Sequence, residues 1–320
     1  MNDEYEKNSM SPNLASKPVS IIGASLLTLA CSTGCVSPSY DGISGDIPSE
    51  TELALSPNGK RLLVSWKDRS DKAHAKLLEL NGSEVASMRE ITLPTHKLTT
   101  AFAKNDEQIL VTTWDRKSSE FYKINLANDE PRLIYKSAFQ IRFPLEVSDE
   151  NYIFLEGVDA NSRSSQWQRY QHGQKSLLNE KHYNLAAPLN VIDGALFLLE
   201  PFTPPAFRSL YGTTPVELNS LVDSSTFFIR CADKNPLTCL RSKIHFEKGP
   251  SYSTMEIFNG KHRCEIDGRW VDLREDIISR DGSTVVFHAA LNEFDGPRAI
   301  YIVKNVNLNC TVNTISIKGS

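Results

Sequence analysis

A short phrase returns six times along this chain: a polar turn, an apolar strand, and then further strands. The turns lie roughly 40 to 50 residues apart, at Asn58-Gly59, Asn105-Asp106, Asp149-Glu150, Asp193-Gly194, Lys234-Asn235 and Asp281-Gly282. Such a period, with several strands in each unit, is the sequence signature of a β-propeller blade. The sequence therefore predicts an all-β fold, a six-bladed β-propeller with four-stranded antiparallel blades.

Each turn is followed by a return strand that is apolar on both faces, as at residues 109–114 and 152–155. A strand that neighbouring blades cover on both sides has this pattern. Asn-Gly and Asp-Gly supply the positive φ angles that a two-residue hairpin turn needs. Third strands are expected at residues 75–80, 120–126, 166–171, 206–211, 254–258 and 298–303, and weaker fourth strands at residues 84–92, 131–135 and 311–317.

Two segments resemble the WD40-like propeller repeat of the TolB type. They are Ser56-Pro57-Asn58-Gly59-Lys60 and the run from Ser279 to Val303, which ends Ala299-Ile300-Tyr301-Ile302-Val303. A typical blade of that family runs Ser-Pro-Asp-Gly-Lys, an apolar strand, and then an Ile-Tyr-Val strand. The resemblance covers residues 50–320 and implies the propeller fold, but it does not name a partner.

The N-terminal region is typical of an export signal. Residues 18–30 carry no charge, and as a helix they would span only about 20 Å, too short for the ~30 Å hydrocarbon core of a membrane. Acidic residues precede Met10, whereas a start at Met10 would leave Lys17 as the only charged side chain before the apolar segment, so both starts stay open. We therefore expect a signal peptide over residues 1–30, a flexible tether over 31–49 and the propeller over 50–320.

The residues after the apolar segment resemble a bacterial lipoprotein signal, in which a small residue precedes a cysteine that is acylated after cleavage. Cys31 follows Ala30 and is the first choice, while Cys35 follows Gly34 and is the second. Export with ordinary cleavage is the alternative. An acyl anchor would hold the protein at a membrane surface without spanning it. The expected location is the periplasm or cell envelope.

The four remaining cysteines suit disulfide bonds in an exported chain. Cys231 and Cys239 flank the turn of the fifth repeat, so they would face each other across an antiparallel hairpin. Cys264 and Cys310 remain as a second pair, which would join two neighbouring blades. A zinc site is the alternative, but the cysteines have no Cys-x-x-Cys spacing.

Motifs that carry catalysis are absent from the sequence. We find no nucleophile elbow, no His-Glu-x-x-His, no P-loop and no dinucleotide-binding glycine motif. We therefore predict no catalytic residue, no metal site and no cofactor. His288 lies on an inner strand, where a core histidine is the simpler interpretation. The net charge of −4 provides no basic footprint for nucleic acid.

Two features remain as candidate contact surfaces. The loop from residue 201 to 207 is apolar for a connection, so its large side chains form a candidate contact patch: Phe202, Pro204, Pro205 and Phe207. Asp68-Arg69 and Asp115-Arg116 recur at equivalent positions of two repeats. They are either surface ion pairs or parts of one binding face.

The sequence leaves two functions open. The first is a lipid-anchored, non-enzymatic binding or scaffolding propeller that holds a protein or an envelope polymer. The alternative is a metal-dependent hydrolase, lactonase or lyase at the channel mouth. It would need several carboxylates to converge on the axis, and the candidates are Asp149, Asp193, Asp223 and Asp281. Hairpin turns already account for most of these residues.

Overall fold

The computed structural model describes residues 51–68, 70–158, 164–178, 189–192, 195–200, 206–211, 218, 220–233, 238–246, 251–259, 262–291, 298–304 and 311–315. All of them belong to one compact unit, residues 40–320. No helix in this described part is both long and apolar enough to cross a membrane.

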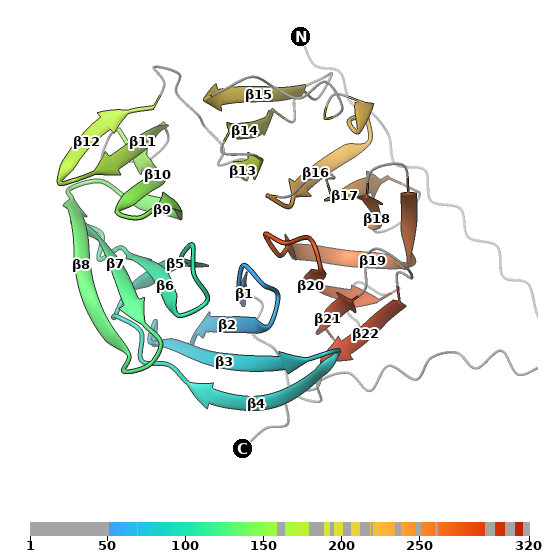
Figure 1. Ribbon diagram of the computed structural model, residues 1–320, viewed down its shortest axis with the longest axis horizontal. Coiled ribbons are helices and arrows are strands. Elements are labelled where there is room, and N and C mark those ends of the chain that lie inside the picture. The colour runs from blue at the N-terminus through green and yellow to red at the C-terminus, as the bar shows by residue number, and fades with distance from the viewer. Residues whose placement is uncertain are drawn as a thin grey trace, which may run out of the picture. The chain divides into compact units, whose positions relative to one another are not determined.

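The described strands form five antiparallel sheets (Figure 1). Three sheets have four strands each: β1 (Glu52–Leu55), β2 (Arg61–Lys67), β3 (Ala73–Asn81) and β4 (Glu84–Glu90); β5 (Lys97–Phe102), β6 (Gln108–Thr113), β7 (Ser119–Asn125) and β8 (Glu130–Ser137); β9 (Ile141–Ser148), β10 (Asn151–Gly157), β11 (Ser165–Gln171) and β12 (Gln174–Leu177). A three-stranded sheet holds β13 (Leu189–Ile192), β14 (Ala195–Glu200) and β15 (Ala206–Tyr211). A seven-stranded sheet holds β16 (Thr226–Cys231), β17 (Thr238–His245), β18 (Tyr252–Asn259), β19 (His262–Ile278), β20 (Thr284–Leu291), β21 (Arg298–Lys304) and β22 (Thr311–Ile315).

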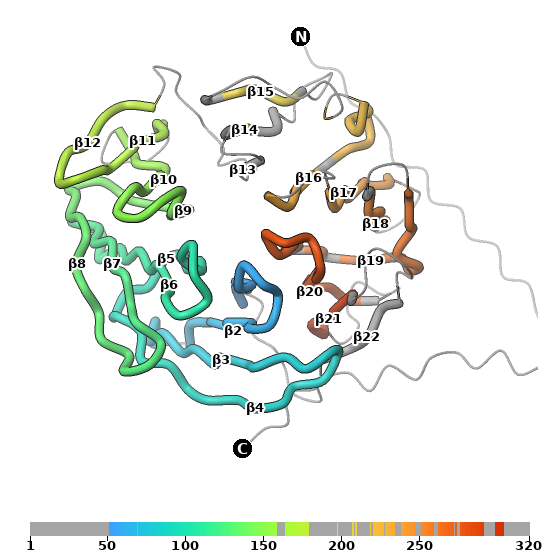
Figure 2. The backbone as a smooth tube through the Cα atoms, viewed as in Figure 1, coloured from blue at the N-terminus to red at the C-terminus, as the bar shows by residue number. Residues whose placement is uncertain are grey.

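Within this unit the sheets are arranged like the blades of a β-propeller. In the four-stranded sheets and the three-stranded sheet, the first strand lies nearest a common centre and the later strands follow outward in chain order (Figure 1). In the seven-stranded sheet β16 to β18 follow the same course, β19 returns toward the centre, and β20 to β22 run outward again (Figure 1). Neighbouring sheets meet through these inner strands, since β1 contacts β5, β5 contacts β9, and β19 contacts β1. Figure 2 traces the backbone around the same centre.

The third strands that the sequence predicts are confirmed. The structure has them as β3, β7, β11, β15, β18 and β21, each within two residues of the expected bounds. The predicted return strands are β2, β6, β10, β14, β17 and β20, and they are buried along most of their length in β2, β6 and β10. Apolar runs between turn signals therefore located these strands correctly.

The seven-stranded sheet is continuous because β19 takes part in two pairings. Its first half pairs with β18 between His262 and Trp270, and its second half pairs with β20 between Trp270 and Ile278. The backbone turns at Gly268, where φ is 139°. One long strand thus serves as the last strand of one meander and the first strand of the next.

The hairpin connections are longer than the expected two-residue turns. The Ser56 N–H donates to the Arg61 carbonyl at 2.9 Å, so the β1–β2 hairpin closes around the four residues 57–60 rather than two. Ser279 and Thr284 make the same bond, also at 2.9 Å, between β19 and β20. The expectation of two-residue turns at these two repeats was therefore wrong. Each loop still contains a tight turn, since the Gly59 and Gly282 N–H groups donate to the carbonyls of Ser56 and Ser279 at 2.9 Å.

The turn residues explain this difference. A two-residue turn of the expected kind needs positive φ at both central residues. Only the glycines have it, with φ of 67° at Gly59 and 69° at Gly282. The side chains of Asn58 and Asp281 instead accept the backbone N–H two residues further on, at 2.8 and 2.9 Å, which is an Asx turn.

The first and last repeats lie directly against each other at these turns. The Asp281 N–H donates to the Pro57 carbonyl at 3.1 Å. A Cβ added at Gly59 would lie 2.4 Å from the Thr284 hydroxyl oxygen, so no larger residue fits there without a shift. The two ends of the propeller-like arrangement are therefore closely packed.

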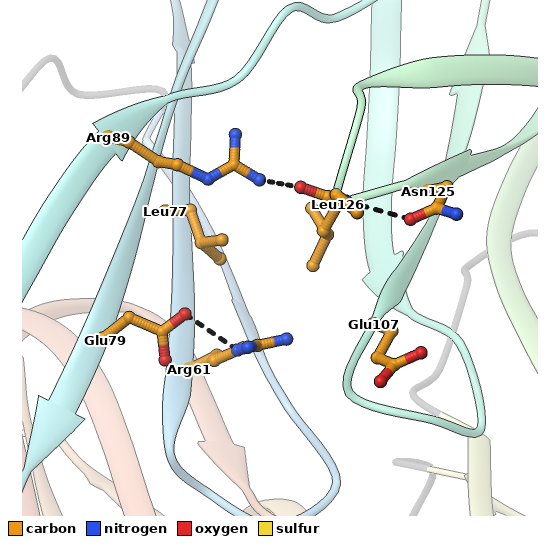
Figure 3. A pocket seen from close by; sticks show the side chains of 8 residues that line it. Arg61, Leu77, Glu79, Arg89, Glu107, Asn125 and Leu126 are labelled. Carbon is orange, nitrogen blue, oxygen red and sulfur yellow. Dashed lines mark hydrogen bonds and ion pairs between the residues drawn. The ribbon is translucent and has the colours of Figure 1, made fainter.

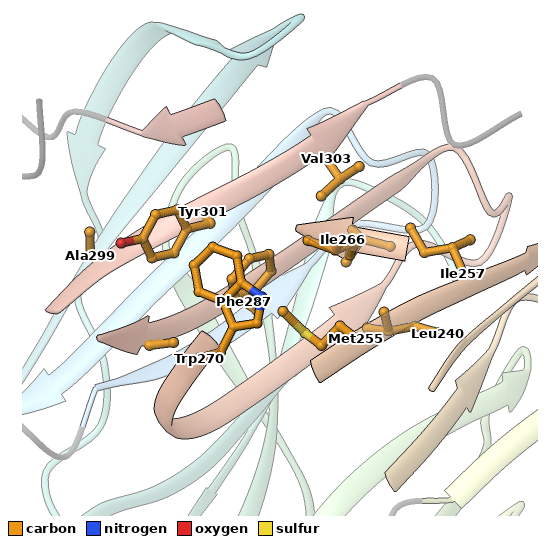
Figure 4. Close-up of a cluster of buried hydrophobic side chains, with 11 residues drawn as sticks. Leu240, Met255, Ile257, Ile266, Trp270, Phe287, Ala299, Tyr301 and Val303 are labelled. Carbon is orange, nitrogen blue, oxygen red and sulfur yellow. The ribbon is translucent and has the colours of Figure 1, made fainter. Parts of the chain in front are cut away.

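The core consists of apolar clusters between and within the sheets rather than one central nucleus. Figure 4 shows the cluster around Trp270, whose ring centroid lies 4.7 Å from that of Phe287 and 4.8 Å from that of Tyr301. All three rings are buried. Edge-to-face contacts of this kind stabilise beyond the area they bury, so the cluster holds β19, β20 and β21 together.

A disulfide bond joins Cys231 and Cys239, the pair that the fifth repeat predicts. The two residues are direct partners in the register of β16 and β17. Cys264 is disulfide-bonded as well. Cys310, which the sequence analysis assigns to it, lies outside the described residues.

The expected contact patch needs a correction at Phe207. Its side chain is 8% exposed and packs in a cluster with Phe197 and Ile229, because it lies on β15 rather than in a loop. Phe202, Pro204 and Pro205 lie outside the described residues. Phe207 therefore contributes to the core and not to a contact surface.

Candidate functional site

A cavity of about 250 Å³ opens where the inner strands of the sheets meet, and we call it the axial cavity. Residues of β1, β5, β9, β16 and β19 line it, and most of them are apolar. Four charged residues also line it, namely Glu52, Arg230, Asp233 and Arg280. Small-molecule and peptide sites have this composition, with apolar walls and a few polar groups that fix orientation.

Phe143 is the most unusual residue of this wall. Its side chain is 40% exposed, although it is large and apolar. Its φ is 51°, a left-handed conformation that is rare for a bulky residue. Strained conformations of this kind persist only where the surrounding structure imposes them, and they cluster at functional sites.

A β-bulge in β9 produces this conformation. Ile153 of β10 pairs with Leu145, and Leu155 pairs with Arg142, so two residues of β9 stand opposite one residue of β10. The two residues of β9 that stand opposite the single residue of β10 are Phe143 and Pro144. Bulges re-aim side chains, and this one leaves the aromatic ring at the cavity rather than in the core.

Glu146 fixes the end of the bulged strand. Its carboxylate accepts a hydrogen bond from the Lys123 ammonium at 2.7 Å and one from the Lys104 backbone N–H at 3.0 Å. The Glu146 side chain is only 1% exposed, and that of Lys123 is 11% exposed. This buried ion pair links β7 to β9 beside the cavity.

Arg280 reaches the same strand from the opposite end of the chain. Its guanidinium donates to the Glu146 backbone carbonyl at 3.0 Å, across a sequence separation of 134 residues. Burial lowers the pKa of the Arg280 guanidinium, while the nearby charges of Asp233 and Glu146 act to raise it. Arg280 thus lines the axial cavity from the β19–β20 turn.

The other charged groups of the cavity wall form ion pairs. Arg230 pairs with Asp276 at 3.2 Å, and burial raises the pKa of the Asp276 carboxyl. Glu52 pairs with Lys97 at 2.5 Å and also accepts the Thr100 backbone N–H at 3.1 Å. These pairs hold inner strands in place, since each joins residues of different strands.

A second cavity, of about 300 Å³, lies between the sheets β1–β4 and β5–β8 (Figure 3). Arg61 pairs there with Glu79 of its own sheet at 2.8 Å and donates to the Asp106 carbonyl, between β5 and β6, at 2.7 Å. Arg89 donates to the Leu126 carbonyl and pairs with Asp129 at 3.1 Å. Its arginines thus connect neighbouring sheets, and it is a weaker candidate for a ligand site.

The aspartates proposed for a metal site do not meet in the described structure. Asp149 is exposed beside a turn, and Asp281 holds the β19–β20 turn. Asp223 pairs with Lys243 at 2.9 Å, and Asp193 lies outside the described residues. Among the residues with described side chains, no group of three or more His, Cys, Asp or Glu could hold a metal ion.

Three further expectations can be placed. His288 is fully buried in β20. Asp68 and Asp115 each accept backbone N–H bonds within their own loops, from Lys72 at 3.0 Å and from Lys117 at 2.8 Å respectively. In the described structure Asp115 forms no ion pair with Arg116. Arg69 lies outside the described residues. Cys31 and Cys35 lie outside them too.

Neither Phe143 nor Arg280 is predicted as a site residue from the sequence. For Phe143 a signal exists, because a proline inside a strand marks an edge or a bulge, and Pro144 follows directly. For Arg280 no local signal exists, since it lies in an ordinary turn next to Asp281. Its place at the cavity depends on contacts with a distant repeat.

No family model matches this chain, and a search of curated proteins finds no match either. Among solved structures, the AtxE2 isopeptidase S527A variant with bound Astexin3-dC4 is 10% identical, with a TM-score of 0.45, 87% of this chain covered and 53% of that one. This chain thus spans about half the length of that isopeptidase.

Two further solved structures are similar. The β-propeller domain of the trilobed protease from Pyrococcus furiosus is 13% identical, with a TM-score of 0.44, 84% of this chain covered and 83% of that one. TolB from Acinetobacter baumannii is 12% identical, with a TM-score of 0.37, 82% of this chain covered and 56% of that one. Because the TM-scores are below 0.5, we infer neither fold nor function from these similarities.

Proposed function

We propose that this protein is a non-enzymatic binding or scaffolding protein that holds a protein or an envelope polymer at the axial cavity. The observation that carries the proposal is Phe143, an exposed aromatic ring that a bulge holds at the cavity in a strained conformation. A protein maintains such strain where the residue makes a contact of its own. Aromatic side chains are also enriched at protein interfaces.

The electrostatics of the cavity support binding rather than chemistry. Glu52 and Arg230 are already engaged with Lys97 and Asp276. A general acid or base needs a titratable group within reach of a substrate, whereas these groups connect inner strands. The apolar wall instead offers area for an apolar part of a partner.

The proposal includes a ring of six blades. Division of the seven-stranded sheet at Trp270 of β19 would add two blades to the three four-stranded sheets and the three-stranded sheet.

The proposal also includes a membrane anchor. Residues 1–30 act as a signal, Cys31 is acylated, and residues 31–49 tether the ring in the periplasm or cell envelope. Cys35 is the second choice for acylation.

Photocrosslinking tests the binding site. A photoreactive phenylalanine analogue replaces Phe143 in cells, and adducts in the envelope fraction are identified by mass spectrometry. The matched control carries the analogue at Leu133, which is 50% exposed on β8 at the outside of its sheet. A defined adduct at position 143 that is missing at position 133 supports the proposal, and the same adducts at both positions would refute it.

Metabolic labelling with palmitate tests the anchor separately. Label should enter the wild-type protein and the Cys35→Ala variant but not the Cys31→Ala variant. Label that is lost only from Cys35→Ala would move the anchor to Cys35. No label in the wild-type protein would show that export occurs without acylation.

A further inference from the structure

Arg280 has the donor capacity for an anionic ligand. A guanidinium carries five N–H donors in a planar fork, and Arg280 uses one nitrogen, Nη2, on the Glu146 carbonyl. Among the residues with described side chains, no carboxylate forms an ion pair with Arg280 within 4.0 Å. It thereby differs from Arg230, which shares the cavity wall but is paired with Asp276 at 3.2 Å.

The charge balance of the wall favours a singly charged ligand. Glu52 and Arg230 of the lining form ion pairs with residues outside it, whereas Arg280 forms no ion pair with a carboxylate of the described residues. The negative charge of Asp233 acts to raise the pKa of the Arg280 guanidinium. A carboxylate carries one negative charge and matches one guanidinium through two parallel hydrogen bonds, whereas a phosphate dianion would bring two negative charges to a single guanidinium.

The size and the walls point to the end of a chain. The volume of about 250 Å³ lies below the ~300–1,000 Å³ that is typical of sites for drug-sized ligands. Most of the wall that Arg280 and Phe143 help to form is apolar, with Leu55, Phe102 and Leu145 among its residues. One apolar side chain fits such a space, with a charged group at one end of it.

We propose that the axial cavity binds the C-terminal residue of a peptide or protein, with its carboxylate on Arg280 and its apolar side chain between Phe143 and the aliphatic wall. The inference rests on the proposed function, because it assigns a ligand chemistry to the same cavity. It goes further in requiring a free chain end. A polymer without carboxylates, or an internal segment of a protein, would not satisfy Arg280.

The test uses the purified full-length protein and a displayed library of peptides with four random C-terminal residues and free carboxylates. Enriched peptides should end in large apolar residues. Each is then synthesised as the acid and as the C-terminal amide, and both are titrated by fluorescence anisotropy. We expect the amide to bind about tenfold more weakly or worse, because charge-assisted hydrogen bonds are the stronger class.

Protein variants locate the effect. In Arg280→Gln the difference between acid and amide should disappear, whereas the matched control Arg132→Gln, at an exposed outer ion pair, should keep it. Arg280→Lys retains a positive charge and serves if Arg280→Gln does not fold; it should reduce the difference because it lacks the fork. Phe143→Ala should weaken acid and amide alike.

Three results would overturn the inference: no enriched peptide, equal affinity for acid and amide, or an unchanged difference in Arg280→Gln. Crosslinking at position 143 separates this failure from that of the proposed function. A specific adduct through an internal segment of a partner would leave the binding function standing and remove only the requirement for a chain end.

Discussion

The buried pair of Glu146 and Lys123 is the most informative place to perturb this fold, because it stands behind both Phe143 and the carbonyl that receives Arg280. In Glu146→Gln the amide oxygen can still accept the Lys104 N–H, but the Lys123 ammonium loses its counter-charge. Breaking a buried ion pair typically costs about 3–5 kcal/mol. Since Lys123 keeps 11% of its side-chain exposure, we expect the low end, about 3 kcal/mol.

Urea unfolding followed by far-UV circular dichroism at pH 7 measures this loss at a constant m-value. The double variant Lys123→Met/Glu146→Gln should cost less than the sum of the single variants by at least ~1 kcal/mol, because contacting residues are coupled. Glu150→Gln is the control: its pair with Arg132 has a similar distance, 2.6 Å, but is exposed, so it should cost only about 0–1 kcal/mol. Additive single variants, or equal losses at Glu146 and Glu150, would refute the reasoning.

Three further predictions concern stability. Replacing Cys231 and Cys239 by serine should lower the free energy of unfolding by about 2–3 kcal/mol, because the bond closes a short loop between residues separated by 8 positions. Reduction of the wild-type protein should cost more, because it also breaks the disulfide bond of Cys264. Trp270→Ala should lower the free energy of unfolding by about 3–5 kcal/mol. Trp270→Phe should cost clearly less, because it keeps an aromatic ring and removes an indole N–H that has no hydrogen-bond partner among the described residues. Equal losses of the two variants in urea unfolding would contradict this. Burial acts to raise the pKa of Glu256, but hydrogen bonds and charges led by Arg241 outweigh it, so the folded pKa lies below the usual 4.5. The unfolded state therefore binds the proton more readily, and the stability from this group should be present at neutral pH and lost as the pH falls below 4.5, with a shallower acid loss in Glu256→Gln.

Local pattern was sufficient for most strands. The third strands follow from apolar runs between turn signals, and β15 and β21 begin at the expected residues, Ala206 and Arg298. The turn lengths were wrong because the Ser56 and Ser279 side chains take part in closing the loops. A rule based only on the two residues of the turn does not include these serine side-chain contacts.

Pairing between two cysteines eight residues apart also follows from local geometry, since a hairpin brings its two flanks together. Phe207 shows the limit of this reasoning. Its neighbouring prolines indicate a loop, yet the residue itself lies on a strand and is buried against Phe197. Exposure depends on which sheet packs over a side chain, and one repeat read alone does not contain that information.

The sequence by itself determined the repeat, the β class and the positions of most strands, because turn chemistry and side-chain alternation act over a few residues. The tertiary structure alone decided the candidate site. Arg280 meets the Glu146 carbonyl across 134 residues, and Phe143 reaches the cavity only because β9 bulges against β10. Both contacts depend on how whole sheets are placed around a common centre, and the free energy that places them comes from packing between repeats rather than from the residues next to the site.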